Sequence, residues 1–224
     1  LEPGDTATFD WLSLSLLPMT VTGLNEVWAT VFLIVGLLGG VFALHVTDRI
    51  QQAGALAYLG SALGVVFAGD LLTLITFWEL MAVSSTLLII NGGRPNSRRA
   101  AMRYLFVHVV GGSLLLAGIV WHLGETGGAF ELAHFNQSVA GWLMFVGVAV
   151  NAAVVPLHAW LPDAYPESSA TSMVFLGAFT TKTAVFVMMT AFAGWEVLLW
   201  LGPLMAIYAG IYSLLQNDIR RILA

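Results

Sequence analysis

The sequence has no cysteine, a single lysine and few charged residues of either sign. Without cysteine, a chain has no disulfide, no thiolate metal site and no cysteine nucleophile. Charged residues make up 9% of the 224 residues and hydrophobic residues 58%. Soluble domains carry roughly 25% charged residues. This composition therefore excludes an ordinary soluble domain and predicts an integral membrane protein.

Motifs typical of soluble catalysis are absent as well. The sequence contains no glycine-rich phosphate loop, no two histidines at i and i+4, and neither a Ser-x-x-Lys nor a Gly-x-Ser-x-Gly signature. We therefore expect no cofactor and no metal site. A quinone-binding redox enzyme stays open as a third class of function, which a bound chromophore or quinone would support.

Seven apolar segments, each with at most one charge, predict transmembrane helices. They are 27–47, 53–69, 71–90, 104–121, 139–157, 171–193 and 196–215. The predicted fold is thus an all-α polytopic bundle over 27–224, preceded by an extended or interfacial lead-in over 1–26. The chain begins without Met and stops where an apolar run starts, so we expect it to be a piece of a longer protein.

The arginines support this count of helices. With seven alternating spans, all of them fall on one side, in or beside the segments 48–52, 91–103, 158–170 and 216–221. The opposite loops contain Glu26, Asp70, Glu125, Glu131 and Glu196 and no cation. Cytoplasmic loops of membrane proteins are enriched in Lys and Arg. We therefore expect the arginine-bearing loops to be cytoplasmic.

Two charges of opposite sign lie inside predicted spans at similar depth. Glu79 is the ninth residue of 71–90, and Lys182, the only lysine, is the twelfth of 171–193. A charge at the bilayer centre costs roughly 2.5 to 3.5 kcal/mol on insertion scales. Hydrocarbon favours the neutral form of such a group, whereas a nearby opposite charge favours the charged form. Glu79 and Lys182 are therefore candidates for a site that switches between the two states. A permanent ion pair that fixes helix register is the alternative.

The segment 139–170 adds polar groups near a predicted helix break. Asn151 lies in an apolar run, and Pro156, Pro162 and Pro166 follow within eleven residues. Proline removes a backbone donor and clashes with the preceding turn, so the helix is predicted to be discontinuous near 156–166. Interrupted helices recur at transporter sites. His158, beside the break, is a candidate proton carrier because imidazole ionises near neutral pH; a histidine that is merely hydrogen-bonded at the interface is the alternative.

His108 is a further candidate on the proton path. It lies four residues into 104–121, within reach of cytoplasmic water, although ordinary helix packing would also explain it. The Trp and Tyr residues lie mostly near the segment ends, as the aromatic belt of a membrane protein does. We therefore expect these aromatic residues to lie at the membrane interface.

Three motifs of the sequence resemble those of the proton-conducting antiporter-like membrane family. The motifs are Phe77-Trp78-Glu79-Leu80, the run 154–167 (VVPLHAWLPDAYPE) and 179–185 (FTTKTAV). The family includes the MrpD-type protein of the multisubunit sodium/proton antiporter and the antiporter-like subunits of NADH:quinone oxidoreductase. Tyr165-Pro166-Glu167 and the segment 217–224 look closest to the MrpD type.

The resemblance implies that Glu79 and Lys182 belong to an intramembrane proton path, with the break as its discontinuous helix. It implies one half of an inverted-repeat transporter, with a first five-helix repeat over 53–193 and the start of the next helices over 196–224. Many members have a lysine seven residues before the histidine, where this chain has Asn151. An amide cannot take up a proton at neutral pH, so this chain lacks the ionisable side chain that many members have at this position of the proton path.

We therefore expect a proton-translocating subunit of a multisubunit sodium/proton antiporter or NADH:quinone oxidoreductase-like complex, in a bacterial inner membrane. Its partners would be other membrane subunits, the lipid bilayer and protons, with Na⁺ as the exchanged cation in an antiporter, and no nucleic acid. By itself it would be a transporter subunit. Whether it forms part of a proton-translocating NADH:quinone oxidoreductase stays open. The alternative is a non-conducting assembly subunit in which Glu79 and Lys182 form the register-fixing ion pair.

Overall fold

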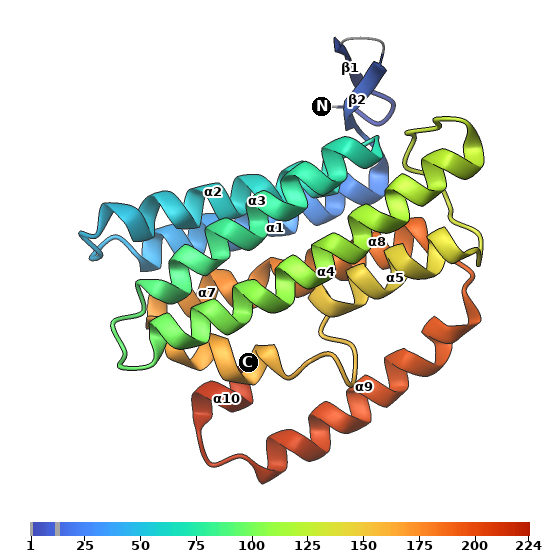
Figure 1. Cartoon of the computed structure of the whole chain (residues 1–224). Helices are drawn as coiled ribbons and strands as arrows, with labels where there is room; N and C mark the ends of the chain where they lie inside the picture. The colour runs from blue at the N-terminus through green and yellow to red at the C-terminus, as the bar shows by residue number, and fades with distance from the viewer. Residues whose placement is uncertain (1, 12–13) are drawn as a thin grey trace.

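The computed structural model describes residues 2–11 and 14–224, which form an N-terminal β-hairpin and a helical bundle (Figure 1). Strand β1 (Thr6–Trp11) pairs with β2 (Leu14–Thr20) in antiparallel orientation. The helices are α1 (Gly23–Phe42), α2 (Arg49–Phe67), α3 (Leu71–Ile90), α4 (Ser97–Thr126), α5 (Val139–Asn151), α6 (Trp160–Ala164), the 3₁₀ turn η1 (Tyr165–Glu167), α7 (Ala170–Ala178), α8 (Thr180–Ala191), α9 (Glu196–Leu215) and α10 (Ile219–Leu223). The predicted all-α membrane bundle is confirmed.

In the described part of the chain, six helical stretches are long and apolar enough to cross a bilayer. They are α1, α2, α3, α4, α7 together with α8, and α9. The remaining predicted span, 139–157, forms only the 13-residue helix α5, which ends at Asn151. About 20 residues at 1.5 Å each are needed to cross the hydrocarbon core. The prediction of a continuous helix over 139–157 is therefore wrong.

The lead-in expected over 1–26 contains the hairpin and the first turn of α1, and its residues 1, 12 and 13 lie outside the described ranges. A capping box begins α1. The Thr22 side chain accepts a hydrogen bond from the backbone N–H of Asn25, and the Asn25 side chain accepts one from the N–H of Thr22. Each side chain satisfies a donor that the helix start leaves free. Helix α1 therefore begins at Gly23, before the expected residue 27.

Asp70 joins three segments at the end of the bundle that carries the hairpin. Its carboxylate accepts hydrogen bonds from the backbone N–H groups of Thr73, in the first turn of α3, and of Leu17 in β2, both at 2.7 Å. The neighbouring Gly69 accepts a hydrogen bond from the N–H of Leu132 at 3.0 Å. Asp70 is 2% exposed. One buried carboxylate thus caps α3 and attaches the hairpin to the tight α2–α3 turn.

Helices α4 and α5 pack with their backbones in contact. A Cβ atom on Gly147 would collide with the backbone of Gly111 and Leu115, and one on Gly118 would collide with that of Met144. Small residues allow such close approach between membrane helices. Because Gly118 lies beside Met144 and Gly111 beside Gly147, the two helices are antiparallel, and their register is fixed.

The predicted discontinuity exists, but it lies earlier in the chain than 156–166. Helix α5 ends at Asn151, residues 152–159 are not helical, and α6 with η1 resumes over 160–167. The ring of a proline collides with the carbonyl four residues earlier. Pro156 therefore ends the helix before Ala152. Pro162 and Pro166 are tolerated because each lies in the first turn of a short helix, where no intrahelical donor is needed.

A second interruption, which the sequence did not predict, divides the span 170–191. Helix α7 ends at Ala178 and α8 begins at Thr180, because Phe179, with φ −108° and ψ −65°, departs from ideal helical angles. Helix α9 follows, and its ribbon runs apart from the other helices (Figure 1). No residue of α9 is buried. The core of the molecule therefore lies among the helices that precede α9.

Candidate functional site

Glu79 lies in the middle of α3 with its carboxylate against α4. It is half-buried, and a Cβ atom on Gly112 would overlap its Oε1 atom. The glycine at position 112 therefore provides the room for this side chain. Within the described residues, Glu79 has no hydrogen-bond partner and no ion-pair partner within 4.0 Å. Its carboxylate thus lies against α4 with no counter-charge within 4.0 Å in the described part of the chain.

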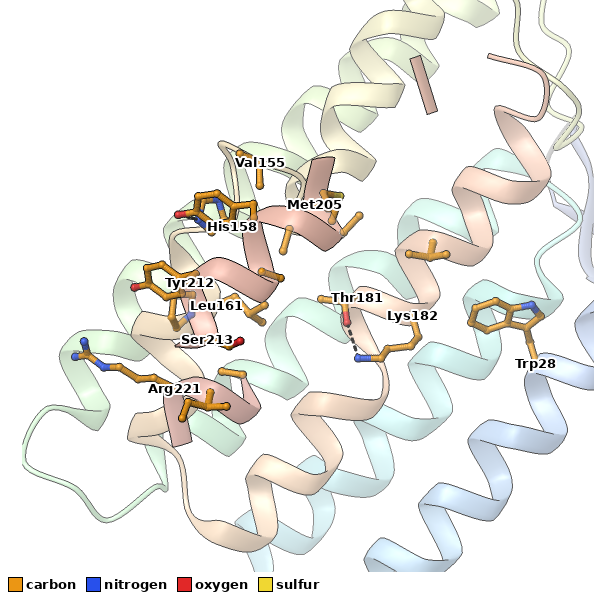
Figure 2. Close-up of a pocket in the computed structure, with 18 residues that line it drawn as sticks. Trp28, Val155, His158, Leu161, Thr181, Lys182, Met205, Tyr212, Ser213 and Arg221 are labelled. Carbon is orange, nitrogen blue, oxygen red and sulfur yellow. Dashed lines mark hydrogen bonds between the residues drawn. The ribbon is translucent and has the colours of Figure 1, made fainter. Parts of the chain in front are cut away.

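Lys182 lies two residues after the start of α8 and lines a cavity of about 380 Å³. Figure 2 shows its ammonium group bonded to Thr181 Oγ1, at 3.2 Å. The cavity is bounded by α8, by the break after α5 and by α9. Lys182 makes no other hydrogen bond to the described residues.

Glu79 and Lys182 do not form the ion pair that the alternative hypothesis requires. The two salt bridges found among the described residues involve neither group. The reason is that the carboxylate lies against Gly112 of α4, whereas the ammonium faces the cavity beside α9. The similar depth predicted for the two charges is therefore not accompanied by a contact between them.

His158 lies in the break and lines the same cavity as Lys182 (Figure 2). Its Nε2 atom is hydrogen-bonded to the hydroxyl of Tyr208 in α9 at 2.9 Å, and its ring contacts the Tyr208 ring edge-on. Its Nδ1 atom is buried without a partner among the described residues. The structure thus brings two predicted site residues, 24 positions apart in sequence, to one cavity.

His108 is deeply buried, which favours the helix-packing alternative over direct access to cytoplasmic water. It is 1% exposed, its ring stacks on Tyr104 at 3.9 Å, and it contacts Trp160 edge-on at 4.5 Å. Helix α4 begins at Ser97 rather than 104, which places His108 about 16 Å inside the helix at 1.5 Å per residue. Its Nδ1 atom bonds to the Tyr104 carbonyl oxygen at 2.9 Å, and its Nε2 atom has no partner among the described residues.

Asn151 ends α5 with a fully buried side chain whose Oδ1 and Nδ2 atoms both lack partners among the described residues. It lies at helical spacing from Met144 and Gly147, on the face that packs against α4. Continuing the antiparallel register of this contact places Asn151 level with His108. Trp160 lies beside both positions: its ring contacts His108, and its Nε1–H donates at 2.9 Å to the carbonyl oxygen of Val150, the residue before Asn151.

The predicted residues therefore form two groups, one around α4 and one at the cavity beside the break. Glu79, His108 and Asn151 lie around α4, and Lys182 and His158 line the cavity. Buried polar atoms without protein partners are usually satisfied by ordered water. An amide and an imidazole offer both donors and acceptors, which suits water better than a cation. No cluster of three or more His, Cys, Asp or Glu that could hold a metal exists in the described ranges.

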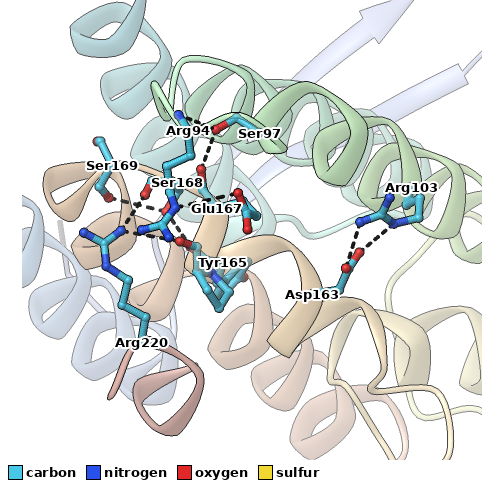
Figure 3. A network of polar contacts seen from close by, with 10 residues as sticks. Arg94, Ser97, Arg103, Asp163, Tyr165, Glu167, Ser168, Ser169 and Arg220 are labelled. Carbon is cyan, nitrogen blue, oxygen red and sulfur yellow. Dashed lines mark hydrogen bonds and ion pairs between the residues drawn. The ribbon is translucent and has the colours of Figure 1, made fainter. Parts of the chain in front are cut away.

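The arginine-bearing segments meet at one end of the bundle, around η1 (Figure 3). Arg103 forms two hydrogen bonds of 2.8 Å to Asp163, and Arg94 lies 3.7 Å from Glu167. Arg220 donates to the Ser168 carbonyl oxygen at 3.1 Å. The side chain of Gln51, near Arg49, donates to Ser169 Oγ at 2.9 Å. The segregation of the arginines read from the sequence thus corresponds to one end of the structure.

Two tyrosines with a place in this site were missed. Tyr208 is the partner of His158, and Tyr58 bonds to Thr180 at the start of α8. We expected the tyrosines at the interface, yet Tyr58, Tyr104 and Tyr165 are at most 1% exposed. A tyrosine inside an apolar span is a signal that could have found Tyr58, because a buried hydroxyl needs a partner.

Comparison with known proteins decides the family. Residues 68–224 match the family model described as NADH:quinone oxidoreductase/Mrp antiporter, TM. The chain belongs to this family. It is 25% identical over 214 residues to the D-type component of the Na(+)/H(+) antiporter of Bacillus subtilis, covering 84% of this chain and 43% of that protein. It is 31% identical over 183 residues to the N-type component of the NADH-quinone oxidoreductase of Desulforudis audaxviator, covering 72% and 36%.

Solved structures of the family share the fold. A chain of the Mrp complex from Dietzia sp. superposes with a TM-score of 0.84 at 23% identity, covering 99% of this chain and 46% of that one. A chain of respiratory complex I from Thermus thermophilus gives a TM-score of 0.81 at 21% identity, covering 96% and 50%. This chain spans less than half the length of the curated relatives named above. It is a multi-pass membrane protein of the antiporter-like type.

Proposed function

We propose that the chain translocates protons as a membrane subunit of an Mrp-type antiporter or an NADH:quinone oxidoreductase-like complex. The observation that carries the proposal is that Lys182 and His158 line one cavity beside a break in a membrane helix. Ionisable groups inside membrane spans are costly and mark ion pathways. The relatives named above support the class of complex, because they are components of an antiporter and of an oxidoreductase.

The proposed path runs from the group around α4 to the cavity. Glu79 exchanges a proton with the water around His108 and Asn151, and Lys182 and His158 exchange one across the break. Glu79 and Lys182 have no ion-pair partner in the described residues, which leaves both groups available for protonation and release. The unpaired Nε2 of His108 and Nδ1 of His158 supply further sites along the way.

Asn151 is the weak point of this path, because an amide does not ionise. Both its polar atoms lack partners within the described residues, so ordered water at this position would satisfy them and continue the path. We expect Asn151→Lys to raise conduction by supplying a charged station. A loss of conduction in that variant would instead identify the amide as a ligand that the path needs.

Orientation and partners follow from the same proposal. The end of the bundle that carries the arginines faces the cytoplasm of a bacterium, as the positive-inside rule requires. Further membrane subunits and bilayer lipid surround the chain, residues 53–193 form the first of two inverted five-helix repeats, and Na⁺ is the cation exchanged in an Mrp-type complex. Inverted repeats of this kind place the transport site near the membrane midplane.

The decisive experiment measures proton flux driven by a pH gradient in vesicles that contain the complete complex. Lys182→Ala should abolish the flux, because no other lysine is present in this sequence to replace it. Ser61→Ala is the matched control, since that buried hydroxyl donates only within its own helix, to the Ala57 carbonyl oxygen. Native flux in Lys182→Ala, at a native amount of protein, would overturn the proposal.

A non-conducting assembly subunit is the competing function, and the observation that favours it is the amide at position 151. The ion pair on which this alternative first rested is absent from the described residues. For an assembly subunit, Lys182→Ala and Asn151→Lys should both leave flux unchanged, whereas deletion of the whole chain should prevent the complex from forming. The two functions are thus separated by the same flux measurement.

A further inference from the structure

The start of α8 lacks the side-chain cap that a helix start within a membrane requires. The first N–H groups of a helix have no acceptor in their own helix. A Ser, Thr, Asp or Asn at the N-cap usually accepts one of these donors. The N-cap of α8 is Phe179, which has no polar side chain, and the first residue, Thr180, is 1% exposed. The backbone N–H of Thr180 therefore has neither surface water nor a cap side chain as its acceptor.

A tyrosine from another helix fills this role. The Tyr58 hydroxyl of α2 accepts a hydrogen bond from the backbone N–H of Thr180 at 2.9 Å. The same hydroxyl lies 2.6 Å from Thr180 Oγ1. Because the Tyr58 oxygen accepts from the N–H, its own proton is free to donate to Oγ1. Both hydrogen-bonding groups of Thr180 at this break are thus held by one residue, 122 positions earlier in the chain.

The ring of Tyr58 is itself fixed by aromatic packing. It meets Phe179 edge-on, with centroids 5.3 Å apart and an angle of 82° between the planes. Phe179 also packs against Phe32 of α1 at 5.3 Å. Tyr58 is fully buried. Helices α1 and α2 therefore hold the residue at which α7 ends and α8 begins.

Lys182 lies two residues after Thr180, and its position depends on where α8 begins. Its ammonium group bonds only to Thr181 among the described residues, so no distant partner anchors it. We propose that Tyr58 is a positioning residue that sets the start of α8 and thereby the place of Lys182 in the cavity. The functional part of this inference rests on the proposed proton translocation.

The test uses the complete complex and two measurements. In hydrogen exchange, Tyr58→Phe should make the amides at the start of α8 exchange at least about tenfold faster, since the acceptor of the Thr180 N–H is gone. In vesicles, Tyr58→Phe should lower proton flux several-fold and change its dependence on pH, because Lys182 is displaced. Ser61→Ala, one turn away on α2, should leave both readouts at native values.

Substitutions at Thr180 separate positioning from a general loss of structure. Thr180→Val removes one of the two bonds to Tyr58 and should reproduce the change in the pH profile, whereas Thr180→Ser keeps both bonds and should behave like the native protein. The double variant of Tyr58→Phe and Thr180→Val should be no worse than Tyr58→Phe alone, because the two hydroxyls act as one unit. Thr180→Val also carries the test if Tyr58→Phe does not accumulate.

The outcomes distinguish this inference from the proposed function. Unchanged exchange at the start of α8 in Tyr58→Phe would overturn the role of Tyr58, whatever the flux. Faster exchange with native flux and a native pH profile would show that the hydroxyl caps α8 without positioning Lys182, which also overturns the inference. If Lys182→Ala keeps native flux, the proposed function fails, and hydrogen exchange alone then decides whether Tyr58 sets the start of α8.

Discussion

The carboxylate of Glu79 occupies the space that a side chain at Gly112 would fill. This contact ties a charged residue of α3 to one backbone position of α4. Glu79 is not among the residues that line the cavity with Lys182. The Glu79 carboxylate can therefore occupy this position because residue 112 has no Cβ atom.

Gly112→Ala should displace the Glu79 carboxylate and reduce proton flux. A displacement of about 1 Å from a reactive position can lower a rate about a hundredfold. We therefore expect the proton flux to fall by a factor of about 10 to 100. Flux into vesicles at matched protein amounts checks this. Gly124→Ala in the same helix has nothing within 4 Å of the added Cβ atom and should conduct normally. Equal flux in both variants would contradict a role for this contact.

Tyr208→Phe should impair conduction through His158. The hydroxyl of Tyr208 bonds to Nε2 of His158 at 2.9 Å, and its removal leaves both imidazole nitrogens without partners among the described residues. A hydrogen bond of this kind contributes about 0.5 to 1.5 kcal/mol, so flux should fall by a small factor, about 2 to 10. Tyr212→Phe is the control, because Tyr212 lines the same cavity and stacks on Tyr208 at 5.8 Å. A larger effect at Tyr212 would refute this assignment.

Asp70→Ala should destabilise the protein far more than Asp48→Ala. Both aspartates cap a helix, and loss of a cap costs about 0.5 to 2 kcal/mol. Asp70 is buried and also accepts from the part-buried N–H of Leu17, so a second donor loses its partner, at a further cost of about 1 kcal/mol. Unfolding in detergent, followed by circular dichroism, should show this difference. Similar midpoints for the two variants would mean that the hairpin contact contributes nothing.

Gly147→Ala should separate α4 from α5. An added Cβ atom would collide with the backbone of Gly111 and Leu115, and overpacking of this kind costs about 1 to 3 kcal/mol. Gly177→Ala in α7 meets nothing within 4 Å, so there we expect a gain of about 0.5 to 1 kcal/mol in the free energy of unfolding. The sign of the change in melting temperature should thus differ between the two glycines.

Much of the architecture could be predicted because it depends on one-dimensional properties. Apolar length predicted the spans, and the arginines predicted the end of the bundle at which Arg94, Arg103 and Arg220 meet around η1. The break was predicted from the prolines, and its true start at Ala152 follows from the collision of Pro156 with the fourth residue before it. These features needed no knowledge of how the helices pack.

The site was harder to predict, because its geometry depends on which way each helix faces. The sequence predicts a similar depth for Glu79 and Lys182, but depth alone does not reveal that one faces Gly112 and the other a cavity. His108 was placed too near the surface because arginines inside α4 were taken to lie before it, whereas long basic side chains extend from within a helix to the interface. The break at Phe179 contains no proline and depends on Tyr58 of another helix.

The stretch between the two breaks has a mechanical consequence. It comprises α6, η1 and α7, and it is attached to α5 and α8 at two non-helical joints, residues 152–159 and Phe179. Between the two joints, Arg103 bonds to Asp163 of α6, and Arg220 bonds to the Ser168 carbonyl oxygen just before α7. Because the helices on either side are regular, a displacement of this stretch would be accommodated by changes of backbone angles at the two joints. One joint adjoins Asn151 and the other lies three residues before Lys182, so a movement of this stretch would displace both of these polar residues together.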